Sequence, residues 1–272
     1  MTIFVLTIVK NELDIIDLWL DATVRWASKI FILDNGSDDG TYERISERAN
    51  DQIVPVGRYL GPYSNALRGR IYREARAEAS PGDWWCVKGD VDEFYLEDPR
   101  LFLARVRRPF HAVDKASVDY VVAREDAETL DFAGSIAQDA GRLRYLKPRR
   151  SVEVRFFRER DVVVWPEDAS GPLNIGPIWP RKIPAAHYHL RSPQQAQVRF
   201  EVRRDARLHG QGFRGTPLES YEELLKPRRD LVLDEGPQSW RLPWSSRQKS
   251  TPRRVVRSLA SEATRPLRRR RR

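Results

Sequence analysis

The first hundred residues alternate between short apolar runs and segments with helical spacing. Four apolar runs predict strands, at 3–9, 29–33, 53–56 and 83–88. Three segments between them repeat apolar residues every three or four positions and predict helices, at 11–24, 42–49 and 65–78, with Asn11 as the cap of the first. Strands that alternate with helices of this length are typical of a parallel sheet with right-handed crossovers.

After Pro99 the pattern becomes less regular. It predicts a helix at 101–106, strands at 116–123, 142–146, 152–158 and 162–165, a loop rich in Gly and Pro at 171–184, and a polar helix at 193–209. Beyond Gly210 it predicts little order until Thr251. We therefore expect an α/β protein with a Rossmann-like, mostly parallel sheet flanked by helices and a mixed α+β second half.

The C-terminal segment carries more than the whole net charge of the chain. Residues 241–272 include twelve Arg or Lys and one acid, Glu262, so this segment carries +11. Because the 272-residue chain carries +9, the other 240 residues carry −2, the difference between the two values. The body is therefore nearly neutral, and the basicity belongs to the tail.

Cysteine usage and hydropathy favour a cytoplasmic protein. The single cysteine, Cys86, cannot form an intramolecular disulfide, which suits a reducing compartment. No apolar stretch is long enough to span a bilayer. The apolar segment 1–9 lacks a basic region before it and predicts a strand, not a signal peptide.

The tail has the pattern of a short basic amphipathic helix. Thr251 before Pro252 is a helix-start signal, and apolar residues at 255, 256, 259 and 263 fall near one helical face among arginines. This pattern predicts binding of residues 250–272 to an anionic membrane surface, and hence a peripheral position at the inner face of the membrane. The alternatives are a disordered solubilising tail and a tail that binds nucleic acid, and nucleic acid is the less expected partner.

Polar motifs follow three of the predicted strands. They are Val9–Glu12 after the first, Asp34–Thr41 after the second and Asp90–Glu93 after the fourth. Because the carboxyl ends of parallel strands meet at one edge, where ligands bind, these motifs predict a shared nucleotide site. Asp90 and Asp92 would point to the same side of an extended chain, and a divalent cation that bridges phosphates would relieve their repulsion. The alternative for this triplet is a solvated acidic turn.

At these motifs the chain resembles family 2-type glycosyltransferases of the GT-A fold. More narrowly, it is similar to a bacterial group that opens with Lys-Asn-Glu and has an adjacent Trp-Leu. The matching motifs are Lys10–Glu12, Asp34–Thr41, Ala66–Arg70, Asp90–Phe94 and His187–Ser192. The resemblance covers residues 3–100 well and 185–205 in part.

The resemblance implies roles for individual residues. The donor nucleotide-sugar would be bound by Asn11, Glu12, Asp34, Asn35, Arg68 and Asp90. Within this set Asp34 or Asn35 would bind the base, and Asn35 stands where the family has Asp. The cofactor would be Mn²⁺ or Mg²⁺, with Asp90, Asp92 and His187 as its ligands. The carboxylate that takes the proton of the acceptor hydroxyl would be Asp168 or Glu93.

Two further kinds of side chain have alternative uses. Arg191, in the late motif, is expected to meet a phosphate or to lie at the surface as an ordinary charge. Trp165 and Trp179 are expected to pack in the core, with stacking on a sugar ring as the alternative.

The expected activity is transfer of a sugar from a nucleotide-sugar donor to a glycan or lipid-linked acceptor, with metal and with inversion. We expect a GT-A domain at 1–215, with a nucleotide-binding half at 1–100 and an acceptor half at 101–215, followed by a poorly ordered basic extension at 216–272. The alternatives are a metal-dependent nucleotidyltransferase and a non-catalytic protein that binds polyanions.

Overall fold

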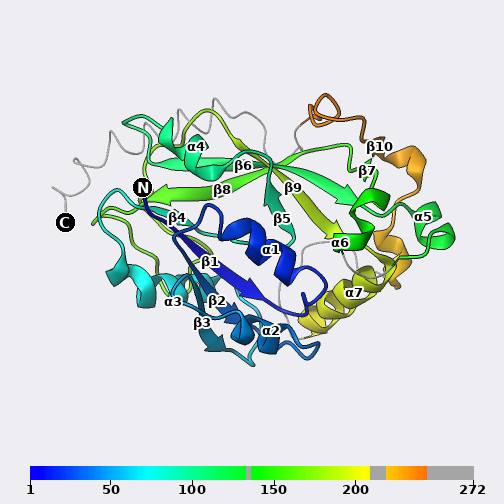
Figure 1. Cartoon of the computed structure of the whole chain (residues 1–272), viewed down its shortest axis with the longest axis horizontal. Coiled ribbons are helices and arrows are strands. Elements are labelled where there is room, and N and C mark those ends of the chain that lie inside the picture. Colours follow the sequence, from blue (N-terminus) through cyan, green and yellow to red (C-terminus); the bar gives the residue numbers. More distant parts are fainter. Residues whose placement is uncertain (133–135, 209–218, 244–272) are drawn as a thin grey trace.

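A computed structural model describes residues 1–132, 136–208 and 219–243 of the protein (Figure 1). Its first hundred residues form a parallel layer in the order β3-β2-β1-β4. These strands are β1 (Ile3–Val9), β2 (Lys29–Asp34), β3 (Ile53–Arg58) and β4 (Trp84–Cys86). The parallel arrangement predicted for this part is confirmed, and the four carboxyl ends meet at one edge.

The connections between these strands are helical, as the spacing predicts. They contain α1 (Ile16–Thr23), α2 (Thr41–Glu47) and α3 (Ala66–Ala75), which continues into the 3-10 turn η1 (Arg76–Glu78). In α1, Ile16, Trp19 and Leu20 are buried because residues three and four apart share one helical face. Asn11 does not cap this helix, since its backbone is left-handed with φ +55° and the N-cap is Ile15.

The second half of the chain completes a ten-stranded mixed sheet. Its path is β10-β7-β6-β8-β4-β1-β2-β3, and β9 pairs with β5 and β6 outside this path. The added strands are β5 (Glu93–Tyr95), β6 (Ala112–Val121), β7 (Tyr145–Leu146), β8 (Ser151–Arg158), β9 (Ile183–Leu190) and β10 (Val232–Leu233). β8 runs antiparallel to both β4 and β6, whereas β9 runs parallel to β6. The prediction of a mostly parallel sheet is therefore wrong, because β8 inserts between the parallel layer and the rest.

Helices and 3-10 turns of the second half lie between and after these strands. They are α4 (Pro99–Ala104), α5 (Arg124–Thr129), α6 (Ile136–Asp139), α7 (Pro193–Leu208), η2 (Ala140–Arg142), η3 (Tyr221–Leu224) and η4 (Arg228–Asp230). α7 confirms the predicted polar helix. The strand predicted at 162–165 is reduced to an isolated bridge between Val164 and Leu173. The prediction of little order beyond Gly210 is wrong for residues 219–243, which pair with the sheet through β10.

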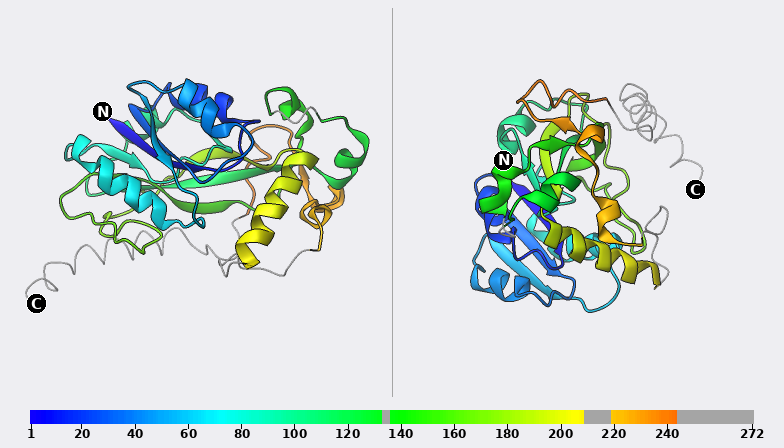
Figure 2. Two further views of the ribbon diagram at one scale, coloured as in Figure 1. Left: turned by 90° about the horizontal axis from the view of Figure 1, so that it is seen from below. Right: turned by 90° about the vertical axis from the view of Figure 1, so that its right-hand side faces the viewer.

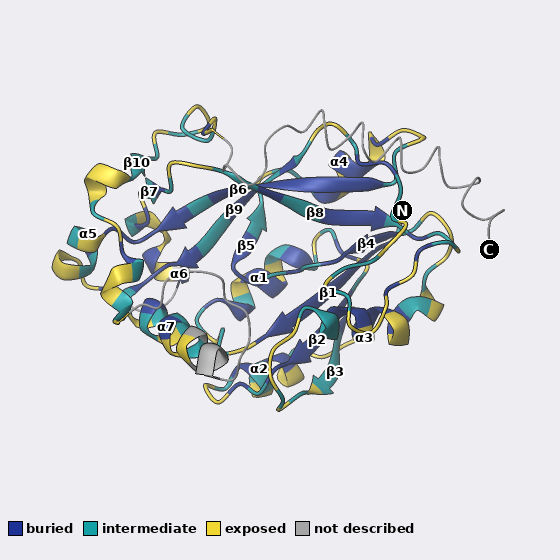
Figure 3. Ribbon diagram, turned by 180° about the vertical axis from the view of Figure 1, so that it is seen from behind, coloured by how far each residue is buried: buried dark blue, intermediate teal, exposed yellow. Residues whose placement is uncertain are grey.

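Two hydrophobic cores lie on opposite faces of the sheet. Adjacent residues of a strand point to opposite faces, so Trp84 and Trp85 of β4 enter different cores. Trp85 stacks on Phe4 with ring centroids 4.7 Å apart and meets the edge of Tyr72 from α3. Figure 3 shows the central strands in dark blue and the exposed residues mainly on the outer faces of helices and in loops.

Figures 1 and 2 show α7, in yellow, at the side of the molecule toward which β1 runs. The helix therefore stands near the carboxyl edge of the parallel layer. The amphipathic helix and membrane contact predicted for 250–272 lie outside the described residues. Among the described helices, none has both the length and the apolar character needed to cross a bilayer.

Candidate functional site

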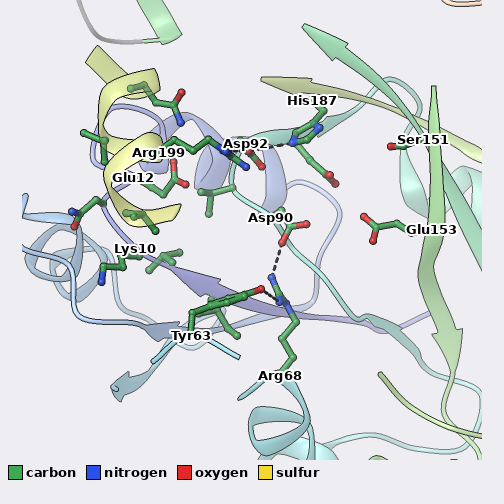
Figure 4. Close-up of a pocket in the computed structure, with 18 of the residues that line it drawn as sticks. Lys10, Glu12, Tyr63, Arg68, Asp90, Asp92, Ser151, Glu153, His187 and Arg199 are labelled. Carbon is green, nitrogen blue, oxygen red and sulfur yellow. Dashed lines mark hydrogen bonds and ion pairs between the residues drawn. The ribbon is translucent and has the colours of Figure 1, made fainter. Parts of the chain in front are cut away.

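A cavity of about 360 Å³ opens beyond the carboxyl ends of β1 and β4, against α7 (Figure 4). Its polar lining consists of Lys10, Asn11, Glu12, Tyr63, Arg68, Asp90, Asp92, Glu93, Lys115, Ser151, Glu153, His187, Gln195 and Arg199. Seven of the residues predicted for the site are among them. Asp34, Asn35 and Asp168 are not.

Asp90 and Arg68 form an ion pair at the cavity wall. Arg68 of α3 donates from Nη2 to Asp90 Oδ1 at 2.7 Å and from Nη1 to the Tyr63 hydroxyl at 2.8 Å. Burial alone would raise the pKa of Asp90, but the guanidiniums of Arg68 and Arg155 hold it below its ordinary value. Asp90 is therefore ionised, and it balances the charge of Arg68.

Asp92 lies in the same cavity but pairs with different cations. Its Oδ2 is 3.3 Å from His187 Nε2 and 3.2 Å from Arg199 Nη1. Burial opposes its ionisation, yet His187 and Arg199 hold the pKa of Asp92 well below its usual range. β4 ends at Cys86, so the alternation of an extended strand does not apply to the two aspartates.

His187 is held between two carboxylates. Its Nδ1 is 2.9 Å from Asp119 Oδ1, and its Nε2 faces Asp92. Burial would lower the pKa of His187, but Asp92 and Asp119 raise it to about 10. The ring is then an imidazolium that donates from both nitrogens to these carboxylates.

Glu93 and Glu153 share two buried cations. Arg155 of β8 contacts Glu93 Oε2 at 2.9 Å and Glu153 Oε1 at 2.6 Å. Lys115 of β6 also pairs with both, because it lies opposite Glu153 in the β6–β8 register. Burial raises the pKa of Glu93, whereas Arg155 and Lys115 overcome burial and lower the pKa of Glu153. Glu93, expected as a possible base, is thus part of a buried ion network.

Carboxylate oxygens of Asp90, Glu93 and Glu153 lie within 4.8 Å of one another. Clustered carboxylate oxygens are donors that Mg²⁺ and Mn²⁺ accept, so this group could hold a divalent cation. It includes Asp90 from the predicted metal set and leaves out Asp92 and His187. A cation here would share these carboxylates with Arg155.

Glu12 is a cavity carboxylate whose pKa lies near neutrality. Burial raises its pKa from 4.5 to about 7, although Arg191 Nη2 donates to its Oε2 at 2.5 Å. Arg191 also contacts both carboxylate oxygens of Asp14, at 2.6 Å each. Arg191 is therefore a buried link between β9 and the loop after β1, and its guanidinium is already bound to carboxylates.

The loop after β2 is held together by the residues that were expected to bind the base. Asp34 accepts from the backbone of Gly36 and Ser37 and from Arg58. Asn35 donates from Nδ2 to the carbonyls of residues 59 and 61, at 2.9 Å each. Both side chains are buried. Asp34 shapes the loop after β2, and Asn35 ties this loop to the segment after β3.

Asn11 joins this loop to the loop after β1. Its Nδ2 donates to Asp38 Oδ1 at 2.8 Å, and the Asp38 amide donates back to Asn11 Oδ1 at 3.0 Å. The left-handed backbone that permits this geometry is tolerated well by Asn. Asn11 therefore sets the rim of the cavity that it lines.

The remaining predicted residues lie elsewhere. Asp168 is exposed and is not a lining residue of the cavity. Trp165 packs in the core against Tyr72, with ring centroids 5.7 Å apart, and donates to the Ala169 carbonyl. Trp179 packs edge-on against Phe110. Both tryptophans serve packing, which was the first of their two expected uses.

Sequence reasoning missed several residues that make the site. They are Tyr63, Lys115, Glu153, Arg155, Arg199 and also Lys10, which was predicted only as part of a motif and was given no role of its own. A charged residue between two apolar neighbours of a predicted strand, as in Val154-Arg155-Phe156, is the signal that could have pointed to Arg155. Tyr63 and Arg199 lie on a loop and a polar helix, where such residues are ordinary.

No model of a protein family matches the chain, and no curated protein matches it. A solved structure from Desulfovibrio desulfuricans G20, named as a candidate nucleotide-diphospho-sugar transferase, is similar with 10% sequence identity and a TM-score of 0.29. That match covers 58% of this chain and 64% of the other, so the chain spans less than two thirds of that protein's length.

Proposed function

We propose that the protein is a glycosyltransferase of the GT-A type that uses a nucleotide-sugar donor. The observation that supports this most is the joining of Lys10, Arg68, Asp90 and Asp92 in one cavity at the carboxyl edge of a parallel layer. This is the edge at which open α/β sheets bind nucleotides. The family 2 motifs of the sequence point to the same edge.

The diphosphate of the donor would lie among the cationic side chains. Lys10 is exposed in the cavity, and Arg68, fixed in the cavity wall by Asp90 and Tyr63, adds a planar guanidinium of the kind that suits phosphate oxygens. Tyr63 is 39% exposed beside Arg68 and offers an aromatic face to the base. We propose this assignment in place of Asp34 and Asn35, whose side chains bond neighbouring segments of the chain and do not line the cavity.

A divalent cation fits the chemistry of Asp90, Glu93 and Glu153, whose carboxylate oxygens are clustered. These residues would hold it, and the cation when bound would neutralise charge on the departing diphosphate. In the protein itself, Arg155 contacts all three carboxylates and Lys115 contacts Glu93 and Glu153, so these two cations hold the carboxylates in place.

The acceptor would be a glycan or lipid-linked hydroxyl, as the resemblance implies. Its proton would pass to a carboxylate of the cavity wall. Glu12 suits this role better than Asp168, because it lines the cavity and its pKa of about 7 lets it take a proton at neutral pH.

Calorimetric titration of UDP and of GDP, with Mn²⁺ present, tests the proposal. Arg68→Gln should weaken binding about ten- to a hundredfold, the range for a lost hydrogen bond to a charged group. Arg70→Gln is the matched control, because Arg70 lies on the same helix, is exposed and pairs with Glu74. Release of a nucleoside diphosphate from a nucleotide-sugar would then separate glycosyl transfer from nucleotidyl transfer. Absence of binding by every nucleoside diphosphate and nucleotide-sugar tried would refute the proposal.

A further inference from the structure

One face of α7 closes the cavity on the side opposite β8. The residues of this face are Gln195, Val198, Arg199 and Val202, at spacings of three and four that place them on one side of a helix. Figure 4 shows Arg199 reaching from α7 toward Asp92, while Glu153 lies across the cavity on β8. Arg199 is thus a cation that the helix brings to the site.

Arginines near the cavity differ in how firmly they are held. Arg155 is fully buried and contacts Asp90, Glu93 and Glu153. The side chain of Arg68 is only 4% exposed and is fixed by Asp90 and Tyr63. Arg155 cannot leave its partners without leaving the buried Glu93 with fewer counter-charges. Arg68 would have to give up hydrogen bonds to Tyr63, Asn65 and Asp90.

Arg199 is held much less firmly. Its side chain is 26% exposed, and its Nη1 meets Asp92 Oδ2 at 3.2 Å. His187 Nε2 lies 3.3 Å from the same Asp92 oxygen. If Arg199 moved away, Asp92 would keep a cationic partner, so the exchange of one anion for another at Arg199 costs the protein little.

We propose that Arg199 is a phosphate-binding residue that Asp92 holds in the ligand-free protein and releases to the diphosphate of the donor. The inference rests on the proposed function, because it needs a diphosphate in the cavity. Its physical basis is that the Asp92 carboxylate and a phosphate compete for binding to the same guanidinium. The guanidinium fork suits phosphate at least as well as it suits a single carboxylate oxygen.

Titration of inorganic pyrophosphate into the full chain, with a chelator to remove metal, tests this without knowledge of the base. Arg199→Gln should raise the Kd about tenfold or more, and Arg199→Lys should raise it less because the charge remains. Arg204→Gln is the matched control on α7, since Arg204 is exposed and lies over the ring of Phe200. It should leave the Kd within about twofold, allowing for the general effect of one charge.

A double-mutant cycle with Asp92→Asn then separates release of Arg199 from a general loss of negative charge. Asp92→Asn should tighten pyrophosphate binding severalfold when Arg199 is present, because the guanidinium is freed. The gain should be absent when Arg199 is replaced by Gln. Melting curves of all variants confirm that each is folded.

The outcomes are distinct. An unchanged Kd in Arg199→Gln overturns the inference and leaves the proposed function in place. An equal gain from Asp92→Asn with and without Arg199 also overturns it, because the effect would then be only electrostatic. Failure of the wild-type protein to bind either pyrophosphate or a nucleoside diphosphate overturns the inference together with the proposed function.

Discussion

Replacement of His187 by Gln tests the charge state of the side chain that joins Asp92 to Asp119. In the folded protein the pKa of His187 is about 10, against an ordinary value of 6.5. A group with a raised pKa in the folded state stabilises the protein fully below pH 6.5, and this stabilisation is lost as the pH rises through 10. Glutamine keeps a hydrogen-bond donor but cannot carry the charge.

The magnitude follows from the difference between the two pKa values. At 1.36 kcal/mol for each pH unit, a rise from 6.5 to about 10 corresponds to a contribution on the order of 5 kcal/mol. The side chain is 20% exposed, so solvent screens this contribution only in part. The wild-type protein should therefore lose several kcal/mol of unfolding free energy between pH 6.5 and 10, and His187→Gln should lose much less.

Urea unfolding of both proteins at intervals from pH 6 to pH 10 measures this difference directly. His189→Gln is the control on the same strand, because burial and Lys147 hold the pKa of His189 well below its usual range. The folded His189 is neutral over this pH range and the unfolded His189 titrates near 6.5, so its replacement should leave the slope well above pH 6.5 intact. Equal alkaline slopes in wild type and His187→Gln would show that the folded imidazole is neutral, and the reasoning from Asp92 and Asp119 would be wrong.

Three further predictions concern other parts of the chain. The pKa of Glu12 is raised from 4.5 to about 7, so the unfolding free energy should fall by about 3 kcal/mol as the pH rises from 4.5 through 7. In urea titrations, Glu12→Gln should remove this fall. Gly69→Ala should destabilise by about 1–3 kcal/mol in the same assay, because a Cβ would lie 2.6 Å from the Trp165 ring; increased stability would contradict this. The full chain should sediment with anionic but not neutral vesicles at low salt, at about 1 kcal/mol for each basic residue, and a chain ending at Gln248 should not; equal pelleting of both would rule out the tail as an anchor.

Local patterns in the sequence were enough to predict the parallel layer and its helices. The β-branched runs and the spacing of Ile16 and Leu20 report the backbone period directly, so β1 to β4 and α1 to α3 are found close to their predicted ranges. The placement of Asp90 and Asp92 at the carboxyl edge follows from the same pattern, because the direction of parallel strands fixes which ends meet. The polar segment at 193–209 was also predicted to be a helix, and it is found as α7.

Only the tertiary structure decided which charges meet. Arg155 lies 65 residues from Asp90, and the two meet because β8 lies antiparallel beside β4, a pairing that no local pattern encodes. The same holds for His187, whose charge depends on Asp92 and Asp119 from two other segments. Asp34 and Asn35 could not be recognised as loop-forming, because a polar turn motif has the same composition whether its side chains bind a ligand or the loop itself. Residue type near a strand end thus points to the edge of the sheet where the cavity lies, whereas ionisation and hydrogen-bond partners depend on long-range strand order.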